Sequence, residues 1–290
     1  MAGRLRVAVF RSLGATISRL PESPVQRIGQ AAARRIGRRE KFRRPLAANL
    51  TRALGGADVA LVDRFVERAM ASYGRYWVEG AMLPRIPAER VAARFQIVEG
   101  MEHLRAAHDA GRGVIVALPH MGSWEWGGAF LATIGLPMTA VAEALEPPEL
   151  FEWFARQREE MGIHVVALDE HASTRLLETL RSGGIVGLLC DRDLTDGGIE
   201  VTFFGERVTL PAGPATLALR TGATLVSAAC FSGPGDGHFA VIRPPLPTER
   251  LGRLRDDVTR VTQEIAHELE ELIQRAPEQW HVLEDRFGAV

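Results

Sequence analysis

The chain has 290 residues, of which 46% are hydrophobic, so it can form one large domain or two small ones with a full core. Cys190 and Cys230 show neither a disulfide framework nor a metal-ligand spacing. We expect neither a transmembrane helix, since no run of 18 or more apolar residues occurs, nor a secretory signal.

The net charge of −1 is divided unevenly along the chain. Residues 1–53 contain 13 Lys and Arg residues against two glutamates, a net charge of +11, so the remaining residues carry −12. Such segregation predicts that the N-terminal part faces an anionic surface.

Residues 3–20 are predicted to form a basic amphipathic helix that Pro21 and Pro24 end. Its apolar residues recur every three or four positions, whereas arginines lie off that stripe: Leu5, Val9, Leu13, Ile17 and Leu20 against Arg4, Arg11 and Arg19. We favour an interfacial helix, with the apolar side in lipid and the arginines at anionic headgroups. A helix that packs on the domain and shows its arginines to water is the alternative.

A second helical stretch, at about 25–53, carries the pairs Arg34-Arg35 and Arg38-Arg39. Nucleic acid is the rival partner for such a cluster, but no base-reading module or set of stacking aromatics accompanies it. We therefore prefer lipid phosphate, and expect no nucleic-acid partner. The predicted domains are a membrane-associating segment at 1–56, closed by Gly55-Gly56, and an α/β domain at 57–290.

The second part begins with a helix at 58–82, in which Arg75 and Glu79 have the spacing of a helical ion pair. From residue 94, apolar runs alternate with helical patterns. Strands are predicted at 95–98, 114–118, 138–143, 165–168, 185–190, 199–204, 225–230 and 239–242, and helices at 101–110, 123–133, 149–161, 173–181, 211–221 and 253–274. This order predicts an α/β fold with a central, mostly parallel sheet flanked by helices.

The most informative segment is 118–126, where a strand gives way to a helix. His120 follows the strand, and Glu125 falls in the first turn of the helix, which Ser123 is expected to cap. A histidine can take a proton from an attacking hydroxyl, and a carboxylate that folds back onto it fixes its tautomer. The amides of residues 121–123 could hold a phosphate or an oxyanion. A chance pair without catalytic meaning is the alternative.

The spacing His120-x4-Glu125 resembles the His-x4-Asp/Glu motif of the lysophospholipid acyltransferase superfamily. The wider sequence resembles its lipid A lauroyl/myristoyl acyltransferase branch, and most of all the actinobacterial phosphatidylinositol mannoside acyltransferases. Further blocks agree in order: 73–79 (YGRYWVE), 191–195 (DRDLT), 203–205 (FFG), 211–215 (PAGPA), 221–223 (TGA) and 276–280 (APEQW). The resemblance runs from about residue 70 to the end.

The resemblance also implies further site residues. Its Asp-x-Asp block, Asp191 to Asp193, is expected to form a wall of the site, with Arg192 able to hold phosphate; a solvated loop is the alternative. Independently of the resemblance, Glu200 is a rival of Glu125 as the partner of His120, and the sequence cannot rank the two; Asp191 is a further alternative. The other expected substrate-binding residues are Trp124 within the motif, Phe203 along an acyl channel, and Glu143 and Arg158.

The expected function is acyl-CoA-dependent O-acylation of a mannose hydroxyl of a phosphatidylinositol mannoside, the acceptor that the resemblance implies. His120 is the general base and no acyl-enzyme forms, because no placed Ser or Cys nucleophile is evident. No cofactor or metal is expected, and attachment is peripheral, at the cytoplasmic face of the cell inner membrane. A lysophospholipid or another lipid-linked sugar as acceptor, an acyl carrier protein as donor, and a non-catalytic lipid-binding protein stay open. Motifs of kinases, nicotinamide enzymes and α/β-hydrolases are absent from the sequence.

Overall fold

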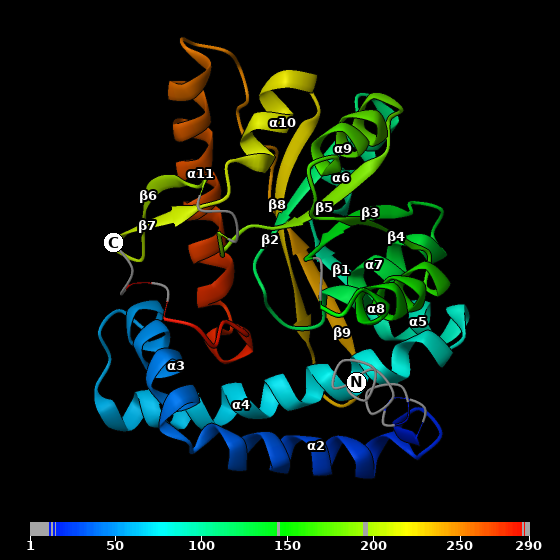
Figure 1. Cartoon of the computed structure of the whole chain (residues 1–290), viewed down its shortest axis with the longest axis vertical. Coiled ribbons are helices and arrows are strands. Elements are labelled where there is room, and N and C mark those ends of the chain that lie inside the picture. Colours follow the sequence, from blue (N-terminus) through cyan, green and yellow to red (C-terminus); the bar gives the residue numbers. More distant parts are fainter. Residues whose placement is uncertain are drawn as a thin grey trace.

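A computed structural model describes residues 12, 14, 16–143, 146–193, 197–285 and 287. Within these residues a seven-stranded sheet has the order β1-β9-β8-β2-β5-β3-β4 (Figure 1). The strands are β1 (Phe95–Glu99), β2 (Val114–Leu118), β3 (Met138–Ala142), β4 (Ile163–Ala167), β5 (Ile185–Leu189), β8 (Thr224–Ser232) and β9 (His238–Ile242). All neighbours are parallel except β8 and β9. The predicted α/β fold with a mostly parallel sheet is confirmed.

The central strand β2 determines where the candidate site lies. All five of its residues are buried, as expected for an apolar strand covered on both faces. Its partner β5 is parallel and in register with it, so that Leu118 pairs with Leu189. Because these two strands end at the same level, the residues two positions further on, His120 and Asp191, emerge side by side.

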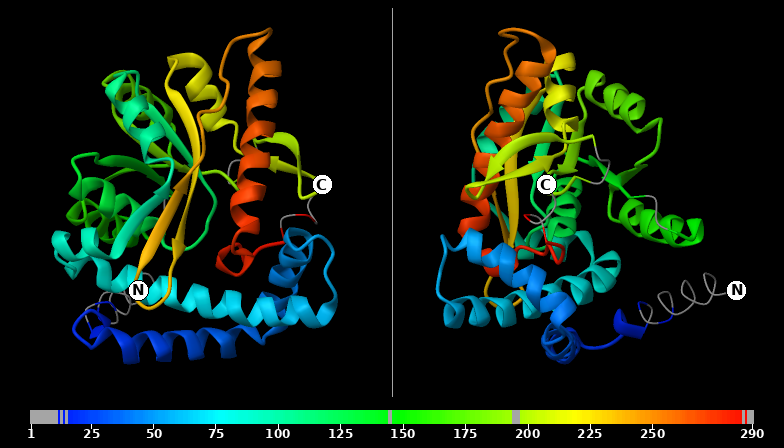
Figure 2. Two further views of the ribbon diagram at one scale, coloured as in Figure 1. Left: turned by 180° about the vertical axis from the view of Figure 1, so that it is seen from behind. Right: turned by 60° about the vertical axis from the view of Figure 1, so that its left-hand side comes forward.

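Helices cover both faces of the sheet (Figure 2). Val114, Val116 and Leu118 point into a core cluster with α6 (Met101–Asp109) and α7 (Trp124–Thr133). Ile115 and Ala117 point the other way, into a cluster with helices α9 (Ala172–Arg181), α10 (Gly213–Thr221) and α11 (Leu254–Gln274). Helix α8 (Pro148–Glu160) packs beside β4. The strand therefore supplies core residues alternately to the two layers.

A separate hairpin of β6 (Ile199–Phe203) and β7 (Glu206–Leu210) packs against α11. The sequence predicted the first strand but not the second. Phe204 and Gly205 join them with positive φ values of 48° and 78°. Two such residues give the twist of a two-residue hairpin turn.

Three helices form a layer at the base of the molecule: α2 (Glu22–Gly37), α3 (Glu40–Ala53) and α4 (Val59–Met82) (Figure 1). Helix α2 runs along α4 at close range, since a Cβ at Gly74 would lie 2.6 Å from the carbonyl oxygen of Gly29. Apolar residues of all three helices share a core cluster, among them Ala33, Leu46 and Val66. The short elements η1 (Leu83–Arg85), α5 (Ala88–Arg94) and η2 (Pro277–Gln279) complete the fold.

The N-terminal predictions need two corrections. The single helix expected at 25–53 is broken at Arg38 and Arg39, where the backbone of Arg39 is extended. Pro24, expected to end a helix, lies in the first turn of α2, where proline is tolerated because the amides there have no partner in the helix. Most of the amphipathic helix predicted at 3–20 lies outside the described residues. No helix in the part that the structure describes is long and apolar enough to cross a membrane.

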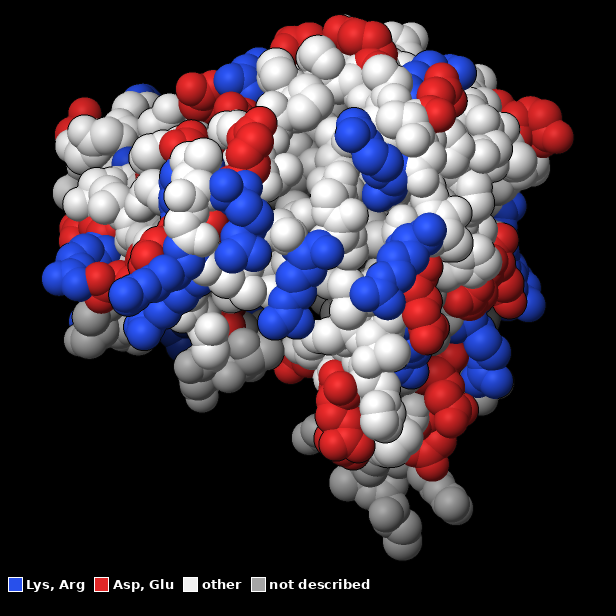
Figure 3. All heavy atoms as spheres, turned by 90° about the horizontal axis from the view of Figure 1, so that it is seen from above, with Lys and Arg blue, Asp and Glu red and all other residues white. Residues whose placement is uncertain are grey.

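The surface of the larger part is not uniformly acidic, although its net charge is −12. On the face shown in Figure 3, Lys and Arg side chains lie around an uncharged central area. Positive charge is therefore not confined to the N-terminal helices, although Asp and Glu side chains also lie on this face.

His238, the first residue of β9, is buried and stacks on Trp126 with ring centroids 4.2 Å apart. Its Nε2 lies 3.5 Å from Oε1 of Glu79, yet neither ring nitrogen has a hydrogen-bond partner in the described part of the chain. Burial, together with the charges of Arg75 and Arg94, lowers the pKa of His238 to about 3. The ring is therefore neutral at physiological pH.

We expect His238→Phe to reduce the acid sensitivity of the fold. Below about pH 6.5 the side chain of His238 is protonated in the unfolded chain, whereas in the folded protein it stays neutral down to a pH of about 3. The free energy of unfolding therefore falls as the pH falls through this range. In this range His238 lowers the free energy of unfolding by at most about 1.4 kcal/mol per pH unit, and phenylalanine, which does not titrate, removes this contribution. Urea unfolding at pH 7 and pH 5 measures this difference. An equal loss of stability in the variant and the wild type would contradict it.

Candidate active site

The turn between β2 and α7 holds His120 in a fixed backbone. Gly122 has φ +57°, and a Cβ there would lie 2.0 Å from the carbonyl oxygen of Cys230, so the turn requires glycine. The amide of Gly122 donates to the carbonyl of Gln279 at 2.9 Å, and the amide of His281 donates to the carbonyl of His120 at 2.7 Å. The Gly122 amide, expected to be open to an anion, is therefore already engaged.

Asp191 is the partner of His120. Its Oδ1 lies 2.6 Å from Nδ1 of the imidazole, and its Oδ2 accepts from the backbone amide of His120 at 2.9 Å. The indole Nε1 of Trp280 donates to the same Oδ2 at 2.7 Å. The carboxylate is fully buried and fixes both the ring and the backbone of the histidine.

The charge of Asp191 determines the tautomer of the imidazole. Burial alone would raise the pKa of Asp191, but the positive charge of protonated His120 and the hydrogen bonds from His120 and Trp280 lower it below its usual value. A carboxylate can only accept, so Nδ1 carries a proton and the neutral ring keeps a lone pair on Nε2. That nitrogen makes no hydrogen bond to any described residue, and the side chain lines a large cavity beside the turn.

Glu125 is not the partner of His120, contrary to the first choice from the sequence. Its Oε1 accepts from Nη2 of Arg158 and from the hydroxyl of Tyr76, each at 3.0 Å. The first turn of α7 directs Glu125 toward α4 and α8, whereas the in-register neighbour strand brings Asp191 to Nδ1 of His120. The alternative partner, Asp191, is the one that the structure supports.

Two further candidates do not reach the site. Glu200 lies on the exposed face of the β6–β7 hairpin, where it pairs with Arg207. Phe203, expected along an acyl channel, is 1% exposed in the core and packs against Trp280 and Phe204. Residue alternation in the hairpin explains both outcomes, since one face meets water and the other meets the core.

Arg192 and Asp193 of the Asp-x-Asp block and Glu143 do line the cavity. Arg192 contacts Glu143 at 3.5 Å and Glu284 at 3.1 Å, so its charge is shared between two exposed carboxylates. Asp193 accepts from the amide of Gly198 at 2.8 Å. The expectation that this block forms a wall of the site agrees with its position, while the substrate-binding roles stay predictions.

Aromatic rings border His120 on the side of α4. Trp124 meets the imidazole edge to face at 5.7 Å between centroids, and Tyr76 packs on Trp124 at 4.4 Å. Burial and the neighbouring Glu125 raise the pKa of Tyr76 well above its usual value, so its hydroxyl stays protonated. Burial and the nearby His120 lower the pKa of His281 to about 3, so this ring is neutral.

Tyr76 and His281 are site residues that the sequence analysis missed. Tyr76 stood in a block that was noted without a role, and His281 directly follows the last of those blocks. Neither residue stands at a spacing that predicts a site, because each reaches the site through tertiary packing.

The cavity beside His120 has a volume of about 770 Å³. On the α7 side its walls come from one apolar cluster, with Leu104, Leu131, Met138 and Ile163. On the other side of the sheet they come from a second cluster, with Leu176, Leu188 and Leu217. His120, Trp124, Glu125 and Arg158 also line this space, so polar groups meet long apolar walls. Among the described residues no group of His, Cys, Asp and Glu is suited to a metal ion.

A family model for bacterial lipid A biosynthesis acyltransferases matches residues 6–288. The chain belongs to this family and is an enzyme that transfers acyl groups. Phosphatidylinositol mannoside acyltransferase from Mycolicibacterium smegmatis is 36% identical over 276 residues, covering 93% of this chain and 87% of the relative. The protein of the same name from Mycobacterium tuberculosis is 37% identical over 278 residues, covering 93% and 84%. The family resemblance drawn from the sequence is confirmed.

A lipid A biosynthesis acyltransferase from Haemophilus influenzae is 25% identical over 186 residues, covering 62% of this chain and 55% of the relative. The crystal structure of 1-acyl-sn-glycerophosphate acyltransferase from Thermotoga maritima aligns with a TM-score of 0.37 and 15% identity, covering 80% and 97%.

Proposed function

We propose that this enzyme transfers a fatty acyl chain from acyl-CoA to a mannose hydroxyl of a phosphatidylinositol mannoside. The observation that carries the proposal is the His120–Asp191 pair at the edge of a large apolar cavity. The names of the two mycobacterial relatives support the choice of acceptor.

In the proposed reaction, Nε2 of His120 takes the proton of the acceptor hydroxyl while its oxygen attacks the thioester carbonyl. The tetrahedral intermediate collapses, the carbon–sulfur bond breaks, and the imidazolium returns its proton to the CoA thiolate. Asp191 stabilises the imidazolium between these two steps. Both cysteines are buried, and burial raises the pKa of the Cys190 thiol, so a covalent thiol intermediate has no support.

The acyl chain fits the apolar part of the cavity. Each methylene group removed from water there contributes about 0.8 kcal/mol, so a chain of common length gains substantial binding energy. The polar residues at the edge then leave the thioester beside His120. A carrier-protein thioester is the alternative donor, because it would present the same acyl chain on a pantetheine arm.

The acceptor's sugar fits the polar side of the cavity. Oε2 of Glu125 has no hydrogen-bond partner among the described residues, although the side chain is buried and lines the cavity. Tyr76 and Arg158 fix the other oxygen, so Glu125 presents one acceptor atom in a defined place. A buried hydrogen-bond acceptor beside the ring of Trp124 suits a polyol, because a polyol donates hydrogen bonds from its hydroxyl groups and presents apolar C–H faces to the ring. In this proposal Glu125 binds the acceptor.

We expect Glu125→Gln to raise the KM for the glycolipid acceptor by roughly 10- to 100-fold, the value of a hydrogen bond to a charged group. The KM for acyl-CoA should stay near that of the wild type. The matched control is Glu152→Gln, which changes an exposed carboxylate of α8. Steady-state kinetics with each substrate varied in turn measure both constants. A fall in kcat with an unchanged acceptor KM would instead tie Glu125 to the chemical step.

We also propose peripheral attachment to the cytoplasmic face of the cell inner membrane through the N-terminal helices. Ile28 and Ile36 of α2 are 69% and 42% exposed, and arginines flank them in the sequence. An apolar stripe between basic residues suits the interface of a membrane with anionic headgroups. Attachment would bring the cavity to its lipid acceptor.

The test of the proposed function is an acylation assay. Purified protein is incubated with palmitoyl-CoA, with and without a mannosylated phosphatidylinositol in vesicles, and the lipids are identified by mass spectrometry. A lipid heavier by one acyl chain is the expected product. CoA release without that product points to a lysophospholipid or another lipid-linked sugar. Vesicle binding without turnover from CoA or carrier-protein donors would contradict catalysis and favour a lipid-binding protein.

A further inference from the structure

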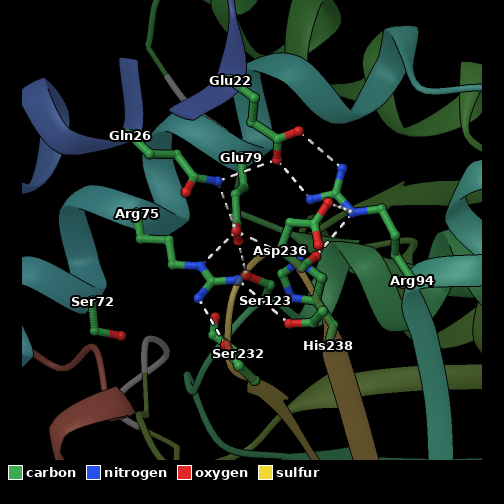
Figure 4. Close-up of polar contacts among 12 residues, drawn as sticks. Glu22, Gln26, Ser72, Arg75, Glu79, Arg94, Ser123, Ser232, Asp236 and His238 are labelled. Carbon is green, nitrogen blue, oxygen red and sulfur yellow. Dashed lines mark hydrogen bonds and ion pairs between the residues drawn. The ribbon is translucent and has the colours of Figure 1, made fainter. Parts of the chain in front are cut away.

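A buried carboxylate of α4 lies behind the His120 turn. Glu79 is 2% exposed and accepts hydrogen bonds on both of its oxygens. Oε1 accepts from Nε of Arg75 at 2.6 Å and from Nε2 of Gln26 at 3.3 Å, and Oε2 accepts from the hydroxyl of Ser123 at 2.7 Å (Figure 4). The predicted Arg75–Glu79 pair is thus present, and its carboxylate also reaches the site.

Ser123 connects this carboxylate to the candidate base. It occupies the N-cap position of α7, but its hydroxyl makes no capping bond to the helix, contrary to expectation. The hydroxyl points instead to Glu79, and Ser123 itself is 2% exposed. Since Ser123 stands three positions after His120, this bond fixes the exit of the same turn.

Arg75 holds Glu79 and a neighbouring loop together. Its Nη1 donates to the carbonyl of Gly233 at 3.0 Å and its Nη2 to that of Gly237 at 3.4 Å, both between β8 and β9. Strand β8 also supplies Cys230, whose carbonyl lies against Gly122. The helix, the loop and the turn therefore share one polar cluster (Figure 4).

The rest of the cluster ties the base layer to the same place. Arg94 of α5 pairs with Glu22 of α2 at 2.6 Å and donates to the carbonyl of Asp236 at 2.9 Å. Gln26 of α2 contacts both Glu22 and Glu79. These contacts hold α2 and α5 but do not touch Ser123, so they provide controls.

We propose that Glu79 is a positioning residue for His120, acting through Ser123. This role rests on the proposed acyl transfer by His120. Asp191 and residues 279–281 hold the turn from one side, and the Ser123–Glu79 bond holds it from the other. The bond is charge-assisted and lies away from water, so it is strong and directional. Without it the first turn of α7 can shift and carry Nε2 away from the attacking hydroxyl, and a displacement of about 1 Å costs roughly 100-fold in rate.

The test compares Ser123→Ala with Gln26→Met. Each variant removes one hydrogen bond from the same carboxylate, but only the first frees the turn. We expect Ser123→Ala to lower kcat by roughly 10- to 100-fold with an unchanged KM for acyl-CoA. Gln26→Met should keep the kcat of the wild type, whatever its melting temperature. A wild-type kcat for folded Ser123→Ala, or an equal fall in both variants, would overturn the proposal.

A double-mutant cycle separates positioning from general destabilisation. If Glu79 acts through Ser123, Glu79→Gln should lower kcat in the wild type and have little further effect in the Ser123→Ala background. Multiplicative losses would mean that the two residues act independently, against the proposal. Melting temperatures of all four proteins show whether the comparison is between folded molecules.

A readout without turnover keeps the proposal separate from the proposed function. The proton between Nδ1 of His120 and Asp191 should give a downfield signal in the NMR spectrum of protein labelled with 15N-histidine. We expect Ser123→Ala to broaden or move this signal and Gln26→Met to leave it unchanged. An unchanged signal in both variants would overturn the positioning role, even if the wild type acylates no lipid.

Discussion

Replacing His120 by alanine is expected to lower the kcat of acyl transfer by roughly 10²- to 10⁴-fold. The side chain supplies the lone pair that receives the acceptor's proton, and no other described residue pairs with Asp191 through an imidazole nitrogen. The fold should persist, because the amides and carbonyls of the turn keep their partners at residues 279–281. Mass spectrometry of the lipid product and a melting curve measure the two effects.

The control for this variant is His164→Ala. His164 is an exposed histidine of β4, and its ring contacts Glu159 at 3.1 Å. This change should leave acyl transfer intact. A folded His120→Ala protein with full activity would refute the mechanism, because no step of it proceeds without the base.

The sequence predicted the fold well because local patterns dominate it. Apolar runs such as 114–118 and 185–190 became buried parallel strands, and the intervening periodic segments became helices within a few residues of their expected ends. The failures lie where the local signal is short or was passed over. The strand β7 is five residues long with only two apolar residues, Val208 and Leu210, so its pattern is short. The break at Arg38 and Arg39 contains no proline, and Gly37, the last residue of α2, is a local signal of the helix end that the expected single helix passed over.

The partner of the histidine could not be predicted in the same way. Three carboxylates were candidates; the motif spacing put Glu125 first, but the sequence could not rank it against Glu200. What decides is the sheet order, in which β5 lies beside β2 and in register with it. Asp191 is 71 positions away in sequence and 2.6 Å away in space. A strand neighbour is a property of the whole fold, so one sequence without structure leaves it open.

The two carboxylates near the base differ in surroundings, and their proposed roles differ accordingly. Asp191 is fully buried, is bonded through both oxygens and has a lowered pKa. Glu125 is held through one oxygen by Arg158 and Tyr76 and keeps the other for a ligand. The first arrangement suits a group that stabilises a charge during reaction, and the second suits a group that binds a substrate hydroxyl.

Replacing Asp191 by asparagine is expected to lower kcat by roughly 10³- to 10⁴-fold while the fold is retained. Oδ2 accepts two N–H groups, from His120 and from Trp280, so the amide oxygen of asparagine must take that position. Its NH₂ group then faces Nδ1 of His120. Since an NH₂ group donates, Nδ1 becomes the acceptor and the ring proton moves to Nε2.

In that tautomer the histidine presents a proton to the acceptor hydroxyl and cannot take one. Steady-state kinetics should therefore show a large fall in kcat with little change in either KM, whereas Glu125→Gln should change the acceptor KM. The 15N chemical shifts of the His120 ring identify the tautomer directly. An Asp191→Asn protein whose Nδ1 is still protonated, or whose kcat is near that of the wild type, would contradict the assignment of Asp191 as the orienting carboxylate. The contrast between the two variants thus tests which carboxylate orients the base.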